Sequence, residues 1–250
     1  MSDLLNLKSE NFSRYEFKYL LKSKQCQDIE SELSHFMVYD GYVHKELSNS
    51  YFVRSLYFDN EENQRYYEKI DGIRLRNKFR IRTYGTSLEE GLPIYLEEKG
   101  RNIDRTYKHR IQIISEHLPK FCLPEQQERL LELFSDDELI QRFVFDVIKN
   151  KTSPKVLVDY IRRPYTSTYD VNFRVTIDSR IKVANANSLF PDQTTNWICC
   201  KAGYSIMEVK FHRRIPAWFH RIIQAYEITR LSISKFCEGM EETGLAIDLS

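Results

Sequence analysis

Charged residues recur two positions apart in several segments of this 250-residue chain. In the first segment, RYEFKYLL, an extended strand would place Glu16 and Lys18 on one face and Phe17 and Tyr19 on the other. The same spacing recurs further along the chain, in Arg80 and Arg82, Glu97 and Lys99, Glu208 and Lys210, and Arg174 with Thr176 and Asp178. Two arginines on one strand face repel each other unless an anion or an acid lies between them. The pattern therefore indicates side chains that bind an anion, with a charged face turned to water as the alternative.

Composition narrows the kind of anion site that this chain could build. The sequence has only eight glycines and contains neither G-x-x-x-x-G-K nor G-x-G-x-x-G, so a phosphate cradle made of backbone amides is not expected. The net charge is +1, so no overall field attracts nucleic acid or anionic lipid. A polyanion site must therefore arise from local clustering of basic side chains.

Cysteine, histidine and apolar patterns indicate a cytoplasmic protein without a preformed histidine-metal or disulfide framework. The five cysteines are odd in number and show no C-x-x-C, and the six histidines show no H-x-H or H-E-x-x-H. The N-terminal stretch MSDLLNLKSENFS lacks the features of a secretory signal, and no apolar window is long enough to span a membrane. These features predict cytoplasmic localisation.

Periodicity predicts about eight strands with helices inserted between groups of them. The expected strands cover residues 14–21, 50–59, 77–85, 93–100, 105–113, 155–167, 173–181 and 204–212. The expected helices cover residues 23–37, 60–70, 124–150 and about 216–228, with a turn or helix at 232–240. Ser23 is the expected cap of the first helix, and Asp136 and Asp137 open a second helix within 124–150. No linker or repeat divides the chain, so residues 1–250 are read as one domain.

The apolar faces of these strands decide where the charges point. Alternate residues such as Phe17, Phe79, Ile81 and Val209 must be buried, and the predicted helices are the available cover. If helices cover the outside of a closed barrel, the charged faces point inward, and a barrel of about eight strands holds side chains or one small ligand. An interior lined by charges needs a bound polyanion and a divalent cation. We therefore predict an α+β protein, an antiparallel β tunnel barrel of about eight strands with helices covering the outside.

The order of short motifs along the chain resembles a known family. The motifs are E-x-K, Y-F-D-N, R-x-R-x-Y-G, a second E-x-K, R-[VI]-[ST]-[IL]-D, [LM]-E-V-K and S-K-F, from Arg14 to about Gly239. This order is similar to the catalytic domain of the vacuolar transporter chaperone (VTC) proteins. Those proteins are polyphosphate polymerases of the triphosphate tunnel metalloenzyme, or CYTH-like, superfamily. Each motif alone is a weak indicator of the family, whereas seven motifs in this order are a specific one.

The resemblance implies roles for individual residues. Matched by motif, the phosphate- or nucleotide-binding residues are Lys18, Arg80, Arg82, Lys99, Lys108, Arg162, Arg174, Lys210, Ser234 and Lys235. Of these, Lys235, Arg80, Arg82 and Lys210 are expected to carry catalysis, and Glu208 is the expected metal ligand. Arg163 competes with Arg162, and Arg110 with Lys108, for the inward-facing position. Glu97 could assist the metal or pair with a neighbouring base.

The function implied is transfer of the terminal phosphoryl group of ATP onto a growing polyphosphate chain, with Mn²⁺ or Mg²⁺ as cofactor. Phosphoryl transfer needs mainly positioning and charge neutralisation, which arginine, lysine and a carboxylate-bound metal supply. Hydrolysis of tripolyphosphate or a nucleoside triphosphate is one alternative, and a polyphosphate or inositol-phosphate receptor without turnover is another. The chain resembles the stand-alone bacterial members of the family. ATP and polyphosphate are thus the expected partners, without nucleic acid, and membrane coupling would need a separate partner protein.

Overall fold

The computed structural model describes residues 14–40, 49–103, 105–127 and 129–248. Its strands are β1 (Tyr15–Lys22), β2 (Met37–Tyr39), β3 (Tyr51–Asp59), β4 (Leu75–Thr83), β5 (Ile94–Asn102), β6 (Arg105–Ile113), β7 (Ser153–Ser167), β8 (Arg174–Asn185), β9 (Ile198–Cys199) and β10 (Tyr204–Phe211). Its α-helices are α1 (Ser23–Leu33), α2 (Gln64–Ile70), α3 (Leu118–Cys122), α4 (Arg129–Leu133), α5 (Glu138–Asn150), α6 (Ala217–Ala225) and α7 (Lys235–Glu242). Short 3₁₀ turns cover Leu88–Glu90, Ser115–His117 and Pro124–Gln126. The α+β class is therefore confirmed.

One antiparallel sheet runs through the whole molecule. Eight strands form a continuous path in the order β1-β10-β8-β7-β3-β4-β5-β6, while β2 pairs with β7 and β9 with β8. Within the described residues, no hydrogen-bonded ladder joins the two edges of the sheet, β1 and β6. These edges meet at one isolated bridge between Arg14 and Thr106. Side chains reinforce this seam, because Lys99 Nζ on β5 lies 3.0 Å from a Glu16 carboxylate oxygen on β1. The predicted barrel is therefore present as a strongly curved open sheet.

Alternation along the strands places charges and apolar side chains on opposite faces, as predicted. On β1, Glu16 and Lys18 line a cavity, whereas Tyr19 and Leu21 are buried on the other face. On β4, Arg80 lines the same cavity, and its neighbours Phe79 and Ile81 belong to an apolar cluster. The charged face of the opening segment RYEFKYLL thus points into the molecule.

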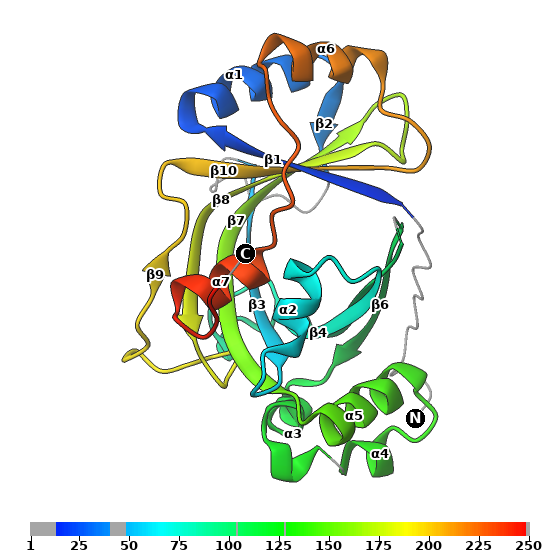
Figure 1. Cartoon of the computed structure of the whole chain (residues 1–250), viewed down its shortest axis with the longest axis vertical. Helices are drawn as coiled ribbons and strands as arrows, with labels where there is room; N and C mark the ends of the chain where they lie inside the picture. The colour runs from blue at the N-terminus through cyan, green and yellow to red at the C-terminus, as the bar shows by residue number, and fades with distance from the viewer. Residues whose placement is uncertain (1–13, 41–48, 104, 128, 249–250) are drawn as a thin grey trace.

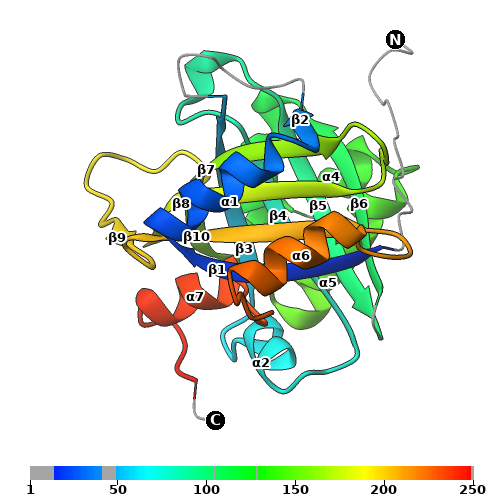
Figure 2. The same cartoon turned by 90° about the horizontal axis from the view of Figure 1, so that it is seen from above.

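Helices cover the outer, apolar face in two groups (Figure 1). Helices α1 and α6 lie side by side over β1, β10 and β8, where residues such as Ile29, Phe219 and Met207 are fully buried (Figure 2). Helices α3, α4 and α5 cover the other half of the sheet around Phe143 and Leu96. This burial supplies the hydrophobic driving force that keeps the sheet curved around its charged face.

Helices α7 and α2 are not part of this outer covering, because residues of both line the charged cavity. Helix α7 packs closely on β7. A Cβ added at Gly239 would lie 2.9 Å from Val156 Cγ2 on β7, so glycine permits this close approach. On β7, Val156 and Val158 alternate onto the same face as Tyr160, which lines the cavity. The helix therefore closes part of the concave face and directs its first residue, Lys235, into the cavity.

The two helix starts give opposite outcomes for the predicted caps. Asp137 caps α5 by accepting hydrogen bonds from the backbone amides of Leu139 and Ile140, as its position predicts. The prediction for Ser23 was wrong, since Lys22 is the N-cap of α1 and Ser23 is already helical. The short strands β2 and β9 were not predicted. Among the described residues, no helix combines the length and hydropathy needed to cross a membrane.

Candidate functional site

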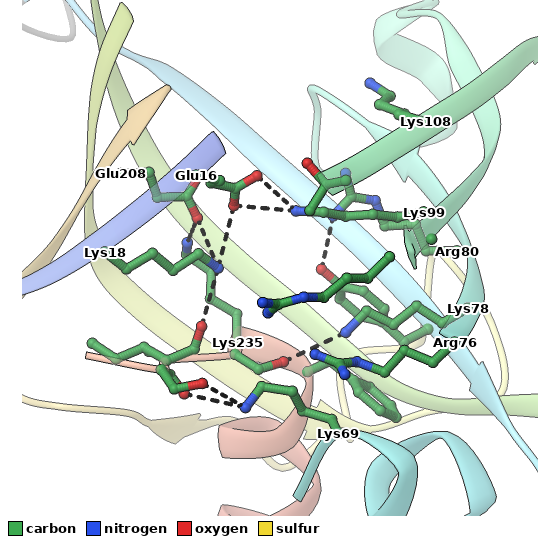
Figure 3. Close-up of a pocket in the computed structure, with 18 of the residues that line it drawn as sticks. Glu16, Lys18, Lys69, Arg76, Lys78, Arg80, Lys99, Lys108, Glu208 and Lys235 are labelled. Carbon is green, nitrogen blue, oxygen red and sulfur yellow. Dashed lines mark hydrogen bonds and ion pairs between the residues drawn. The ribbon is translucent and has the colours of Figure 1, made fainter. Parts of the chain in front are cut away.

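The concave face of the sheet encloses a cavity of about 480 Å³, within the range of about 300–1,000 Å³ typical of small-molecule sites. Among the described residues that line it, fifteen are arginine or lysine and two, Glu16 and Glu208, are acidic. Figure 3 shows these side chains converging from several strands and from α7. Such an excess of clustered, largely half-buried positive charge is costly without a bound anion. The lining therefore favours a polyanionic ligand.

The first buried acid, Glu208 on β10, is surrounded by basic side chains. Lys235 Nζ donates to it at 2.9 Å, and ion pairs reach it from Arg162 at 3.2 Å, Lys210 at 3.3 Å and Lys18 at 3.4 Å. Burial raises the pKa of Glu208, but the four cations, Lys235 foremost, outweigh burial and hold this pKa well below its ordinary value. The carboxylate is therefore ionised at neutral pH and available as an oxygen ligand.

A second acid, Asp178 on β8, shares two partners with Glu208. Asp178 is fully buried, accepts two 2.7 Å hydrogen bonds from Arg162, and lies 2.5 Å from Lys235 Nζ. Lys235 opens α7 directly after Ser234, whose hydroxyl accepts from the Cys237 amide at 3.4 Å and caps the helix. The helix start thus fixes the lysine at the cavity wall.

The third acid, Glu97 on β5, organises a separate group of bases. Arg80 and Lys108 approach its carboxylate at 2.6 and 2.7 Å, and Arg82 at 3.8 Å. Arg82 also donates to Tyr160 Oη at 3.0 Å. Glu97 is fully buried and has three basic neighbours, so in this structure it pairs with bases, which is one of its two predicted roles.

The structure places ten of the eleven predicted site residues on the cavity wall. These are Lys18, Arg80, Arg82, Lys99, Lys108, Arg162, Glu208, Lys210, Ser234 and Lys235. The structure also decides between the competing bases, because Arg162 and Lys108 line the cavity whereas Arg163 and Arg110 do not. Arg163 pairs with Glu30 of α1 on the outer side, and Arg110 lies over the Tyr95 ring at 4.9 Å and is not part of the lining. The roles of the ten residues remain predictions.

Arg174 requires a correction, because it does not line the cavity. It pairs in register with Lys210 across β8 and β10, so it lies on the predicted face of the sheet. However, it is the first residue of β8, its side chain is 52% exposed, and its ion-pair contact is with Asp40 at 3.9 Å. Alternation gives the face of the sheet correctly but cannot give the position along the tunnel.

Several lining residues were missed by sequence reasoning. Lys78 and Arg76 continue the two-residue spacing of Arg80 and Arg82 along β4, so the same rule could have found them. Glu16 was recognised as inward-facing without being given a role. Lys69, on helix α2, carries no strand periodicity and offered no signal.

Two titratable groups near Arg80 have shifted pKa values. Burial would raise the pKa of Tyr57, but the charges of Arg80, Lys78 and Arg82 outweigh burial and lower it to about 7. The Tyr57 hydroxyl accepts a 2.9 Å hydrogen bond from Arg80 Nη1. Burial, together with the nearby charges of Lys99 and Lys18, lowers the pKa of Lys78 to about 8. This part of the wall therefore carries cations that partly repel one another.

We expect tripolyphosphate affinity to fall as pH rises through 8. Lys78 is charged below its pKa of about 8 and neutral above it, and burial lowers the pKa of Lys108 to about 8 as well. Between about pH 7 and pH 9 the affinity should drop about tenfold, whereas Lys78→Arg should flatten the curve because arginine stays charged. Isothermal titration calorimetry at each pH checks this. Equal slopes for the variant and the wild type would remove Lys78 from the binding site.

The cavity also offers carboxylates suited to a divalent cation. Lys18 Nζ lies 3.5 Å from Glu16 and 3.4 Å from Glu208, so a positive charge already stands between these two carboxylates. Hard ions such as Mg²⁺ bind through one or two carboxylates together with substrate phosphates. In the described parts of the chain, no group of three His, Cys, Asp or Glu side chains is arranged to hold a metal. Metal binding at Glu208 therefore stays a prediction, in which phosphate oxygens would complete the ligand set.

Comparisons with known proteins agree with this geometry. The family model of the VTC domain matches residues 13–243. A solved structure from Bacillus halodurans, proposed to be an adenylate cyclase, aligns over 88% of this chain and 92% of its own, with 11% identity and a TM-score of 0.51. A protein from Hippeastrum, proposed to be an adenylyl cyclase and described as having a dominant triphosphatase activity, aligns over 92% of this chain and 96% of its own, with 12% identity and a TM-score of 0.54. At 11% and 12% identity, these two alignments show that the structures share a fold with this chain.

Proposed function

The chain belongs to the VTC domain family, and we propose that it transfers the terminal phosphoryl group of ATP onto the end of a polyphosphate chain. The observation that carries this proposal is the tunnel wall of basic side chains with its buried carboxylates. Both substrates are chains of phosphates, so one basic cavity suits donor and acceptor alike. Placing two polyanions end to end requires strong neutralisation, which fifteen basic lining residues supply.

The proposed reaction has a simple balance of bonds. A terminal oxygen of polyphosphate attacks the γ-phosphorus of ATP, a new P–O bond forms, and the bond between that phosphorus and the β–γ bridging oxygen breaks, releasing ADP. Arg80 and Arg82 would hold phosphate oxygens through their planar guanidinium groups, and Lys235 would neutralise charge as a point donor. Glu208, assisted by Glu16, would hold Mn²⁺ or Mg²⁺, and the bound ion would neutralise phosphate oxygens.

The second candidate function is hydrolysis of tripolyphosphate or a nucleoside triphosphate. The same cavity supports it if water takes the place of the polyphosphate end. The triphosphatase activity described for the Hippeastrum protein, which shares this fold, favours this alternative. A receptor without turnover would need the basic wall but not the ion pair of Glu208 with Lys235.

We expect the purified protein, incubated with ATP and Mn²⁺, to produce a ladder of polyphosphate on a stained gel together with stoichiometric ADP. Release of free phosphate without a ladder would replace the polymerase by the hydrolase. If neither product appears, titration with tripolyphosphate tests the receptor, since mass action should raise the melting temperature with ligand concentration. A melting temperature indifferent to tripolyphosphate would contradict every anion-tunnel function.

A further inference from the structure

A basic groove continues the tunnel on the surface beside α2. It is lined by four cations, Lys69, Arg74, Arg76 and Arg101, together with Ser232 and one acid, Asp248. Lys69, Arg76, Arg101 and Ser232 also line the tunnel cavity, so the groove adjoins the cavity and shares part of its wall. In Figure 3, Lys69 and Arg76 lie at the end of the cavity opposite to Lys108. The groove therefore extends the tunnel at one defined end.

The pairing of β4 with β5 explains the positive charge at this end of the cavity. Arg80 lies opposite Glu97, a neutralised rung, whereas the next inward-facing rung pairs Lys78 with Lys99, and only Lys99 of the two has an ion pair with Glu16, at 3.0 Å. The rung after that pairs Arg76 with Arg101. Like charges directly opposite each other destabilise a sheet, and an anion lying between them relieves the repulsion. Arg76 lies four residues from Arg80 along β4, so the last like-charged rung lies about 14 Å from Arg80, toward the groove.

Backbone and side-chain hydrogen bonds fix the residues at the outer rim of the groove. The Ile103 amide donates to the Arg74 carbonyl at 2.9 Å, which joins the turn after β5 to the segment before β4. Arg101 Nε donates to the Ile103 carbonyl at 2.7 Å, and Lys69 Nζ donates to Ser232 Oγ at 2.8 Å. Burial and the charges of Arg76 and Arg101 lower the pKa of Lys69. The cations are thus fixed close to one another by the fold.

We infer that this groove binds the part of a polyphosphate chain that extends beyond the tunnel, so that the protein binds long chains more tightly than short ones. The inference rests on the proposed function for the identity of the chain. It follows from the basic wall that the groove shares with the cavity and from the like-charged rungs along that wall. Longer chains would contact Arg74 and its neighbours, whereas tripolyphosphate would be held within the tunnel.

The test compares Arg74→Glu with Arg221→Glu by calorimetry, using tripolyphosphate and a long-chain polyphosphate of defined length. Arg74 lines the groove but not the tunnel and is exposed. Arg221 is an exposed residue of α6, on the opposite side of the sheet from the tunnel, and its reversal changes the net charge equally. We expect Arg74→Glu to weaken long-chain affinity about tenfold while changing tripolyphosphate affinity less than about twofold. Arg221→Glu should change neither affinity.

Equal long-chain affinity in wild type and Arg74→Glu, or an equal loss in Arg221→Glu, would overturn the inference. So would stronger binding of a single-stranded oligonucleotide than of polyphosphate at the groove, judged by loss of that binding in Arg74→Glu. The assay contains neither ATP nor metal, so it does not depend on turnover. If the gel assay shows no polymerase and the chain-length effect persists, the proposed reaction fails while the groove stands.

Discussion

Replacing Arg80 by methionine should lower turnover by about two to three orders of magnitude, the loss typical of removing one preorganised charge donor from a transition state. Arg80 Nε donates to Glu97 at 2.7 Å, and Nη1 donates to Tyr57 Oη at 2.9 Å. These two contacts hold the guanidinium in one orientation on the cavity wall. Methionine keeps much of the side-chain volume but cannot bind a phosphate oxygen as a cation.

The fold should survive this change. Glu97 keeps Lys108 at 2.7 Å and Arg82 at 3.8 Å, so the buried carboxylate is not left without a cation. The matched control is Arg174→Met, because Arg174 belongs to a similar strand motif but lies outside the cavity with a half-exposed side chain. Steady-state turnover and a melting curve on both variants check the prediction. Wild-type kinetics in Arg80→Met, or the same loss in Arg174→Met, would show that the cavity is not the reaction site.

The sequence predicts the two faces of each strand well, because alternation is a local property of extended backbone. Glu16, Lys18 and Arg80 all point inward as their spacing requires. The same rule, extended four residues from Arg80 toward the start of β4, would have added Lys78 and Arg76. The sequence therefore contains the information that extends the charged face along β4 as far as Arg76.

Closure of the tunnel could not be predicted in this way. The segment before α7 crosses β1, where the Leu231 amide donates to the Lys18 carbonyl at 2.8 Å. Lys18 Nζ in turn donates to the Ile233 carbonyl at 3.1 Å. These contacts join residues more than two hundred positions apart, and no periodicity records them. Lys235 was found only through the resemblance of S-K-F to a family motif, and Lys69 was not found at all.

The second large effect is expected for Glu208→Gln, which preserves shape and removes the charge that a hard divalent ion requires. Lys235, Arg162, Lys210 and Lys18 would then face a neutral amide, so tripolyphosphate should bind at least as tightly as before. Turnover should nevertheless fall about a hundredfold or more, roughly 3 kcal/mol of barrier. The measurement is turnover across a Mn²⁺ titration, paired with tripolyphosphate affinity for the same protein.

Glu97→Gln separates metal binding from simple charge pairing. Glu97 is also a buried acid among three bases, so a purely structural role would give both variants similar losses of stability and similar metal titrations. If Glu208 holds the metal, its variant alone should need a higher Mn²⁺ concentration for half-maximal turnover, because the ion loses an anionic ligand. An unchanged Mn²⁺ titration in Glu208→Gln, with turnover close to that of Glu97→Gln, would make Glu208 a partner of Lys235 and not a metal ligand.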